Sequence, residues 1–155
     1  MIILGLLISQ CILLERGNMM MPVERIEYNN ELLAIIIRSD YDKNGIDFLT
    51  PGDFSQQMAY MHHPSGHVIQ PHYHNRVERS VYYTQETLVI KEGKLQVDFY
   101  DEEQHKINET VLCAGDVILL CKGGHGFSVI EEVKMIEIKQ GPYAGDNDKT
   151  RFVPK

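Results

Sequence analysis

The sequence predicts an all-β protein whose strands form an antiparallel sandwich or barrel. Short apolar or alternating stretches recur from residue 31 onward, turn signals separate them, and no long segment after residue 24 has helical periodicity. The spacing leaves no room for the crossover helices that parallel strands require. With 155 residues the chain suits one domain, which we expect over residues 22–155.

The expected strands follow in order along the chain. The β-branched stretch from Leu32 to Ile37 is the first, and DKNG after it is a turn signal. Residues 86–101 are predicted to form a hairpin that turns at Glu92-Gly93, with Leu88 and Ile90 on its apolar face. Three more short strands are expected over residues 116–121, 125–130 and 134–139, separated by KGG and by EEV.

Residues 1–21 are expected to lie outside the domain. They form an apolar leader, or an upstream extension if translation starts at one of the three methionines 19–21. A packed helix or strand and a targeting segment are the alternatives. The apolar run 1–14 is too short to cross a bilayer, and no Lys or Arg precedes it, so we expect no membrane association.

Charge and cysteine content narrow the function classes. The net charge is -7 and no run of Lys or Arg stands out, which excludes nucleic acid bound through a dense basic face. The three cysteines, Cys11, Cys113 and Cys121, are too few for a disulfide framework, so we expect a reducing, cytoplasmic location. Cys121 is expected to be a buried small hydrophobe.

Histidine is the unusual residue of this composition. Five of the seven fall within residues 62–74. His72 and His74 are two apart on an expected strand, and the period of two points both imidazoles to one face. Glu86 lies on the apolar face of the next strand, where an unpaired carboxylate is costly, and His125 precedes another apolar strand. Three imidazoles and one carboxylate predict a site for one divalent transition metal, namely iron, manganese, nickel or zinc.

These residues resemble the two motifs of the cupin superfamily. Gly66, His72-x-His74, Glu86 and Gly93 are similar to the first motif, and Gly115, Cys121-x-Gly123 and His125 to the second. The resemblance covers residues 57–140. It implies a small antiparallel β-barrel of the jelly-roll, double-stranded β-helix type, with one metal held by His72, His74, Glu86 and His125. It also implies a homodimer.

Some assignments remain open within this interpretation. Glu78 lies at the spacing from His74 that the family more often shows, whereas Glu86 keeps the six-residue gap to Gly93, and we prefer Glu86. The neighbouring histidines, His62, His63 and His67, are alternative ligands. His105 lies in a polar turn and is expected to be solvated.

Two polar segments are expected to line the barrel mouth or to cover its edges. The first, NRVERSVYYTQ, contributes candidate substrate-binding residues Arg76 and Arg79 and candidate proton carriers Glu78, Tyr82 and Tyr83. The C-terminal segment contributes the candidate substrate-binding residues Tyr143, Lys149 and Arg151.

The expected function is that of a metal-dependent enzyme, an isomerase or epimerase for a small polar, sugar-like or anionic metabolite. An iron-dependent oxygenase is one alternative. A non-catalytic, metal-containing module that binds a small ligand is another, and a metal that only stabilises the strands is the simplest.

Overall fold

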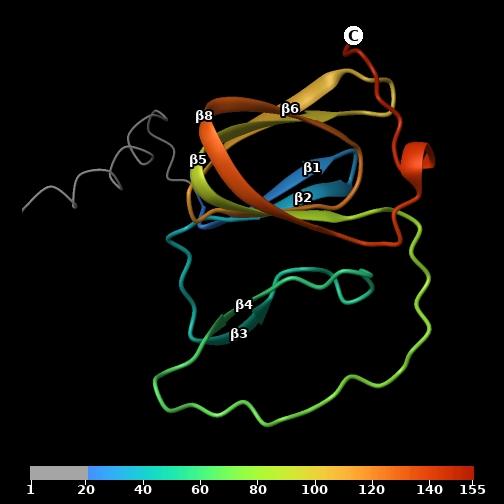
Figure 1. Ribbon diagram of the computed structural model, residues 1–155. Helices are drawn as coiled ribbons and strands as arrows, with labels where there is room; N and C mark the ends of the chain where they lie inside the picture. The colour runs from blue at the N-terminus through green and yellow to red at the C-terminus, as the bar shows by residue number, and fades with distance from the viewer. Residues whose placement is uncertain (1–20) are drawn as a thin grey trace, which may run out of the picture.

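The computed structural model describes residues 21–155 and consists almost entirely of antiparallel strands (Figure 1). The expectations for residues 1–20 lie outside the described residues. The strands are β1 (Val23–Tyr28), β2 (Glu31–Ile37), β3 (Gly45–Phe48), β4 (Ala59–His62), β5 (Glu86–Tyr100), β6 (Lys106–Cys113), β7 (Val117–Leu120) and β8 (Gly124–Lys139), followed by a short 3-10 turn, Gly145–Asn147.

The main sheet curls into a half-barrel around β5. Its strand order is β1-β2-β7-β5-β6, and β8 also pairs with β5. The first half of β5 lies between β7 and β8, and the second half lies between β6 and β8. The predicted all-β, antiparallel, barrel-like class is therefore confirmed at this level. A two-stranded sheet of β3 and β4 lies apart from the half-barrel (Figure 1).

Alternation along the strands places one core on each face of the sheet. The inner face carries fully buried side chains of β5 and β7, including Leu88, Leu95 and Ile118. The outer face of β2 and β7 packs against Leu49 and Met58 from the connection between β3 and β4. That connection is therefore anchored to the sheet although the β3–β4 hairpin is not part of it.

Two strand predictions are wrong in the same way. Residues 86–101 do not form a hairpin, because β5 continues through Gly93 as one bent strand. Likewise residues 125–130 and 134–139 belong to one strand, β8, which bends beside Gly93 through register shifts. Gly93 has φ +83°, and a Cβ there would lie 1.9 Å from the carbonyl oxygen of Glu132. The glycine therefore permits a close crossing of two continuous strands and does not make a turn.

The strand expected around His72 and His74 is also absent. Residues 63–85 form no strand, and residues 68–84 are exposed throughout. They run as one long connection from β4 to β5, beneath the half-barrel in the view of Figure 1. No backbone ladder holds this segment, so the alternation argument that aligned the two imidazoles does not apply to it.

A buried arginine joins the beginning and the end of the sheet. Arg38 is 8% exposed, and its guanidinium donates to Glu24, to Asp116 Oδ2 at 2.9 Å and to the carbonyl of Val111. Burial alone would lower the pKa of Arg38, but hydrogen bonds and charge from Glu24 and Asp116 raise it. The network joins the end of β2 to β1, β6 and the turn before β7.

Within residues 21–155, no helix is long and apolar enough to cross a membrane.

Candidate functional site

The candidate site begins with a carboxylate and an imidazole that face each other inside the half-barrel. Glu86 opens β5 and has its side chain on the same face as the core residues Leu88 and Ile90. His125 lies at the start of β8, opposite the core residue Phe99. His125 Nε2 is 3.2 Å from Glu86 Oε2, and the two side chains are 28% and 14% exposed. The sequence predicted both as inward-facing, and the structure brings them together.

Lysine and aspartate side chains extend this pair. Lys139 is opposite Glu86 in the ladder, and its Nζ lies 4.0 Å from Glu86 Oε1 and 2.8 Å from Asp148 Oδ2. The hydrogen bond from His125 lowers the pKa of Glu86, and the charges of His125, Lys139 and Lys149 lower it further, against the opposing effect of burial. Glu86 is therefore held as a carboxylate beside an imidazole.

His72 and His74 do not reach Glu86 and His125 in this structure. Both are exposed on the connection from β4 to β5, with their rings 5.4 Å apart. His72 Nδ1 is 2.9 Å from the carbonyl oxygen of Gln70. Among residues 21–155 no three His, Cys, Asp or Glu side chains are grouped closely enough to hold a metal. The structure thus brings together two of the four predicted donors and leaves the other two apart.

The alternative ligands also lie away from this pair. Glu78 is exposed on the same connection as His72. His62 Nδ1 is 2.6 Å from Asp42 Oδ1, on the β3–β4 hairpin, and this contact is the largest cause of the lowered pKa of Asp42. His63 and His67 stack with ring centroids 4.2 Å apart, and His63 Nε2 is buried with no hydrogen-bond partner among residues 21–155.

The predicted ligand-binding residues divide into two groups. Tyr83 and Tyr143 lie near the site, because Lys122 Nζ is 5.4 Å from the Tyr83 ring and Lys139 Nζ is 5.4 Å from the Tyr143 ring. The charge of Lys149 also reaches Glu86. Tyr82 is exposed and lines the larger hollow described below. The remaining predicted residues, Arg76, Arg79 and Arg151, are exposed.

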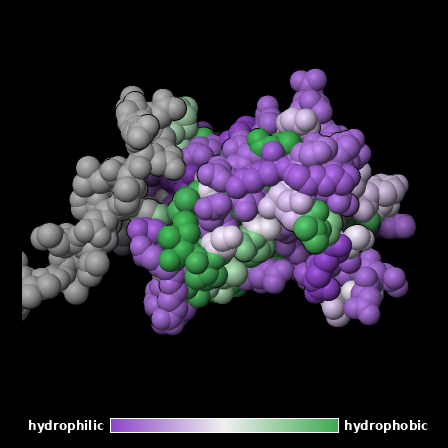
Figure 2. Space-filling model, turned by 90° about the horizontal axis from the view of Figure 1, so that it is seen from above, coloured by the Kyte–Doolittle hydropathy of each residue, from purple (hydrophilic) through white to green (hydrophobic). Residues whose placement is uncertain are grey.

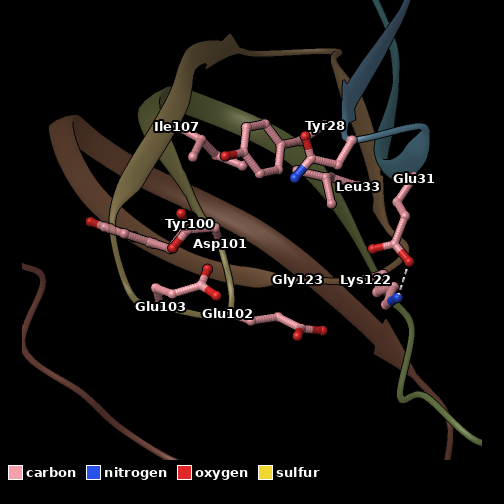
Figure 3. A pocket seen from close by; sticks show the side chains of 11 residues that line it. Tyr28, Glu31, Leu33, Tyr100, Asp101, Glu102, Glu103, Ile107, Lys122 and Gly123 are labelled. Atoms are coloured by element: carbon pink, nitrogen blue, oxygen red, sulfur yellow. Dashed lines mark hydrogen bonds and ion pairs between the residues drawn. The ribbon is translucent and has the colours of Figure 1, made fainter.

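Two hollows border this region. One of about 520 Å³ is lined by residues 81–84, by Lys122 and by residues of the C-terminal segment that include Gln140 and Asp148. The other, of about 310 Å³, lies between Tyr28, Leu33, Ile107 and a run of acidic residues, Asp101, Glu102 and Glu103 (Figure 3). Glu31 and Lys122 form an ion pair at its rim (Figure 3). The C-terminal segment, expected to line the barrel mouth or to cover its edges, therefore does border a hollow, although Glu86 and His125 are not among the residues that line it.

Several residues of this region were not identified from the sequence. Lys139, Asp148 and Lys122 belong to segments that resemble ordinary polar strand ends and turns. None of the three carried a sequence signal, because the register of β8 against β5, which places Lys139 opposite Glu86, is a tertiary feature. Cys121, by contrast, is as predicted: it is 3% exposed in the outer core, and burial raises the pKa of its thiol to about 12. His105 lies in an exposed turn, also as predicted.

The comparisons with known proteins do not assign a family, because no family model, no curated protein and no solved structure matches the chain.

Proposed function

We propose that this protein is a metal-binding protein of the cupin type that acts as an isomerase or epimerase on a small anionic metabolite. The observation that carries the proposal is the pair formed by Glu86 and His125. Both are partly buried on the concave face of a curled antiparallel sheet, and they come from strands far apart in the chain. A carboxylate and an imidazole in contact supply two donors that suit a divalent first-row metal.

The other two proposed donors, His72 and His74, do not fit the metal as the chain is arranged here. A four-donor site requires the exposed connection between β4 and β5 to approach the start of β8. His72 and His74 are free to do so, since no ion pair or strand ladder holds that part of the connection among the described residues. The bound metal would supply a Lewis acid that polarises a carbonyl oxygen.

The residues around the pair support an anionic substrate. Lys122 lies over the Tyr83 ring and Lys139 over the Tyr143 ring, so both bring positive charge to this region. Lys122 and Tyr83 line the hollow of about 520 Å³, which is large enough for a small metabolite. Tyr83 is 58% exposed and borders that hollow, so its hydroxyl is accessible to a bound ligand as a proton carrier.

Metal content tests the proposal directly. Protein purified without chelators is expected to contain one equivalent of a transition metal, and both Glu86→Ala and His125→Ala are expected to lose it. His105→Ala is the matched control, because His105 is an exposed turn residue whose ring lies 3.6 Å from Asp101. Unchanged metal in Glu86→Ala and His125→Ala, or loss in His105→Ala as well, would contradict the assignment. Iron in the protein would favour oxygen chemistry over isomerisation.

A further inference from the structure

The longest strand of the protein has one unpaired edge. β8 contains sixteen residues and pairs only with β5 among the strands of residues 21–155. Among its side chains, six apolar ones are exposed, and they lie on both faces: Phe127 41%, Val129 61%, Ile130 51%, Met135 40%, Ile136 49% and Ile138 54%. Phe127 and Val129 even belong to the concave face, since they lie opposite Val97 and Leu95 of the core. A long, unpaired edge that exposes several apolar side chains is a template for another strand.

The connection between β4 and β5 is an exposed segment without a strand partner. Residues 66–83 are long enough to match β8, form no strand, and expose the apolar side chains Val68, Ile69, Tyr73, Val77 and Val81. Figure 1 shows this segment running clear of the half-barrel. The adjoining β3–β4 hairpin likewise exposes Ile46, Phe48 and Met61. By contrast, the view from above shows a mostly hydrophilic surface with separate apolar patches (Figure 2).

Charge also matches between these two surfaces. Arg76 and Arg79 of the connection form no ion pair among the described residues, and Arg79 Nη1 only approaches the carbonyl of Val77 at 3.4 Å. On β8, Glu132 and Glu137 have no cation within ion-pair distance among those residues. A segment with two arginines that form no ion pair therefore suits an edge that carries Glu132, whereas the charge of Glu137 already acts on Lys139.

Contacts at both ends hold the connection in its outward path. Before it, Gln56 Nε2 donates to Thr87 Oγ1 at 2.6 Å, and Met58 is packed in the outer core. After it, the backbone N–H of Gln85 donates to Gln140 Oε1 at 2.6 Å, and Gln140 in turn donates to Ser55 Oγ at 2.9 Å. These bonds fix where the segment leaves and rejoins the sheet, and residues 68–84 between them are exposed.

We infer that residues 66–83 of one copy pair with the free edge of β8 in a second copy, and that the exchange is reciprocal. Each chain supplies one segment and one β8 edge, so two copies close a symmetric, strand-exchanged dimer in which both β8 edges are paired. The inference rests on the proposed function in one respect: His72 and His74 of one chain would then reach Glu86 and His125 of the other, so each metal site would be shared between two chains.

The oligomeric state tests the surface independently of any metal. Light scattering on the eluting protein is expected to give twice the chain mass of 17.8 kDa. Val77→Lys in the segment and Val129→Lys on β8 are expected to give monomers. Val153→Lys is the matched control, because Val153 is 83% exposed and lies on neither surface. A monomeric wild-type protein, or a dimer that persists in both Val77→Lys and Val129→Lys, would overturn the inference.

Mixed dimers test which chain provides which donor. One chain carries His72→Ala with His74→Ala, and the other carries Glu86→Ala with His125→Ala. Each alone is expected to bind no metal. After unfolding together and refolding in equal amounts, half of the dimers are mixed, and each mixed dimer has one intact site, so the metal content returns to about a quarter of the wild-type value. No recovery, with a metal-containing wild-type protein, means that each chain closes its own site and overturns the exchange. A dimer that depends on Val77 and Val129 but contains no metal supports the exchange and refutes the proposed function alone.

Discussion

Gly93→Ala is predicted to be strongly destabilising, because two separate costs meet at this position. The residue has φ +83°, a left-handed conformation that costs a residue with a Cβ about 1–2 kcal/mol. The added Cβ would also lie 1.9 Å from the carbonyl oxygen of Glu132 and 2.9 Å from Cα of Val133, all backbone atoms of β8. Forcing extra volume into a packed site costs about 1–3 kcal/mol more. The sum is about 3 kcal/mol, which lowers Tm by about 6–12 °C for a domain of this size.

Gly66→Ala separates the two costs. Gly66 has the same φ of +83°, but nothing lies within 4 Å of the position that an added Cβ would take. This variant is therefore expected to show only the conformational cost, about 1 kcal/mol, in urea unfolding followed by circular dichroism. Equal losses of unfolding free energy in Gly93→Ala and Gly66→Ala would refute the close crossing of β5 and β8. Equal losses are the result expected if Gly93 were in a hairpin turn, where only the conformational cost applies.

Three shorter predictions concern other parts of the sheet. Arg38→Ala is expected to lower the free energy of unfolding by about 3–5 kcal/mol, because it leaves Asp116, which is 3% exposed, without the guanidinium that pairs with it. Lys43→Ala removes an exposed ion pair and should cost under about 1 kcal/mol. Comparable urea midpoints for the two variants would contradict this prediction. The hydrogen bond from His125 lowers the pKa of Glu86, so ionised Glu86 contributes its full stabilisation above the ordinary glutamate pKa and loses it as the pH falls through the lowered pKa. Wild-type protein should therefore lose more unfolding free energy in that acid range than Glu86→Gln. Parallel plots of stability against pH for the two proteins would count against the pair. Burial raises the pKa of the Cys121 thiol to about 12, so alkylation near neutral pH should be slow until the protein is unfolded. Rapid labelling of the folded protein would show that the outer core is open.

The strands with the clearest alternation were predictable, and their continuity was not. The β-branched run of β2 and the apolar run of β7 lie where the sequence places them. Glycine after a charged residue is equally typical of a turn and of a sharp bend within a strand. Only the approach of Glu132 to Gly93, which joins residues far apart in the chain, decides between the two. Strands β1, β3, β4 and β6 are short or strongly polar, and local patterns did not identify them.

The candidate site was predictable where a strand carries the residue. Glu86 and His125 face inward because their positions alternate in phase with core residues. The prediction for His72 and His74 depended on a strand that the structure does not form, and a segment without a ladder has no defined face. Lys139 and Asp148 meet Glu86 through the sheet register and the C-terminal turn, which are tertiary features that no local spacing encodes.

Lys139 is a competitor for the proposed metal, and Asp148 determines how strongly it competes. Its ammonium group is 2.8 Å from Asp148 Oδ2 but 4.0 Å from Glu86 Oε1, so Asp148 holds the positive charge away from the carboxylate that the metal needs. The hydrogen bond to Asp148 is also the largest cause of the raised pKa of Lys139.

Asp148→Asn should release Lys139 toward Glu86 and weaken metal binding about two- to fivefold in a chelator titration, whereas Lys139→Met should strengthen it by a similar factor. The double variant should match Lys139→Met, because Asp148 acts only through the lysine. An effect of Asp148→Asn that persists in the Lys139→Met background would instead make Asp148 a direct participant in the site.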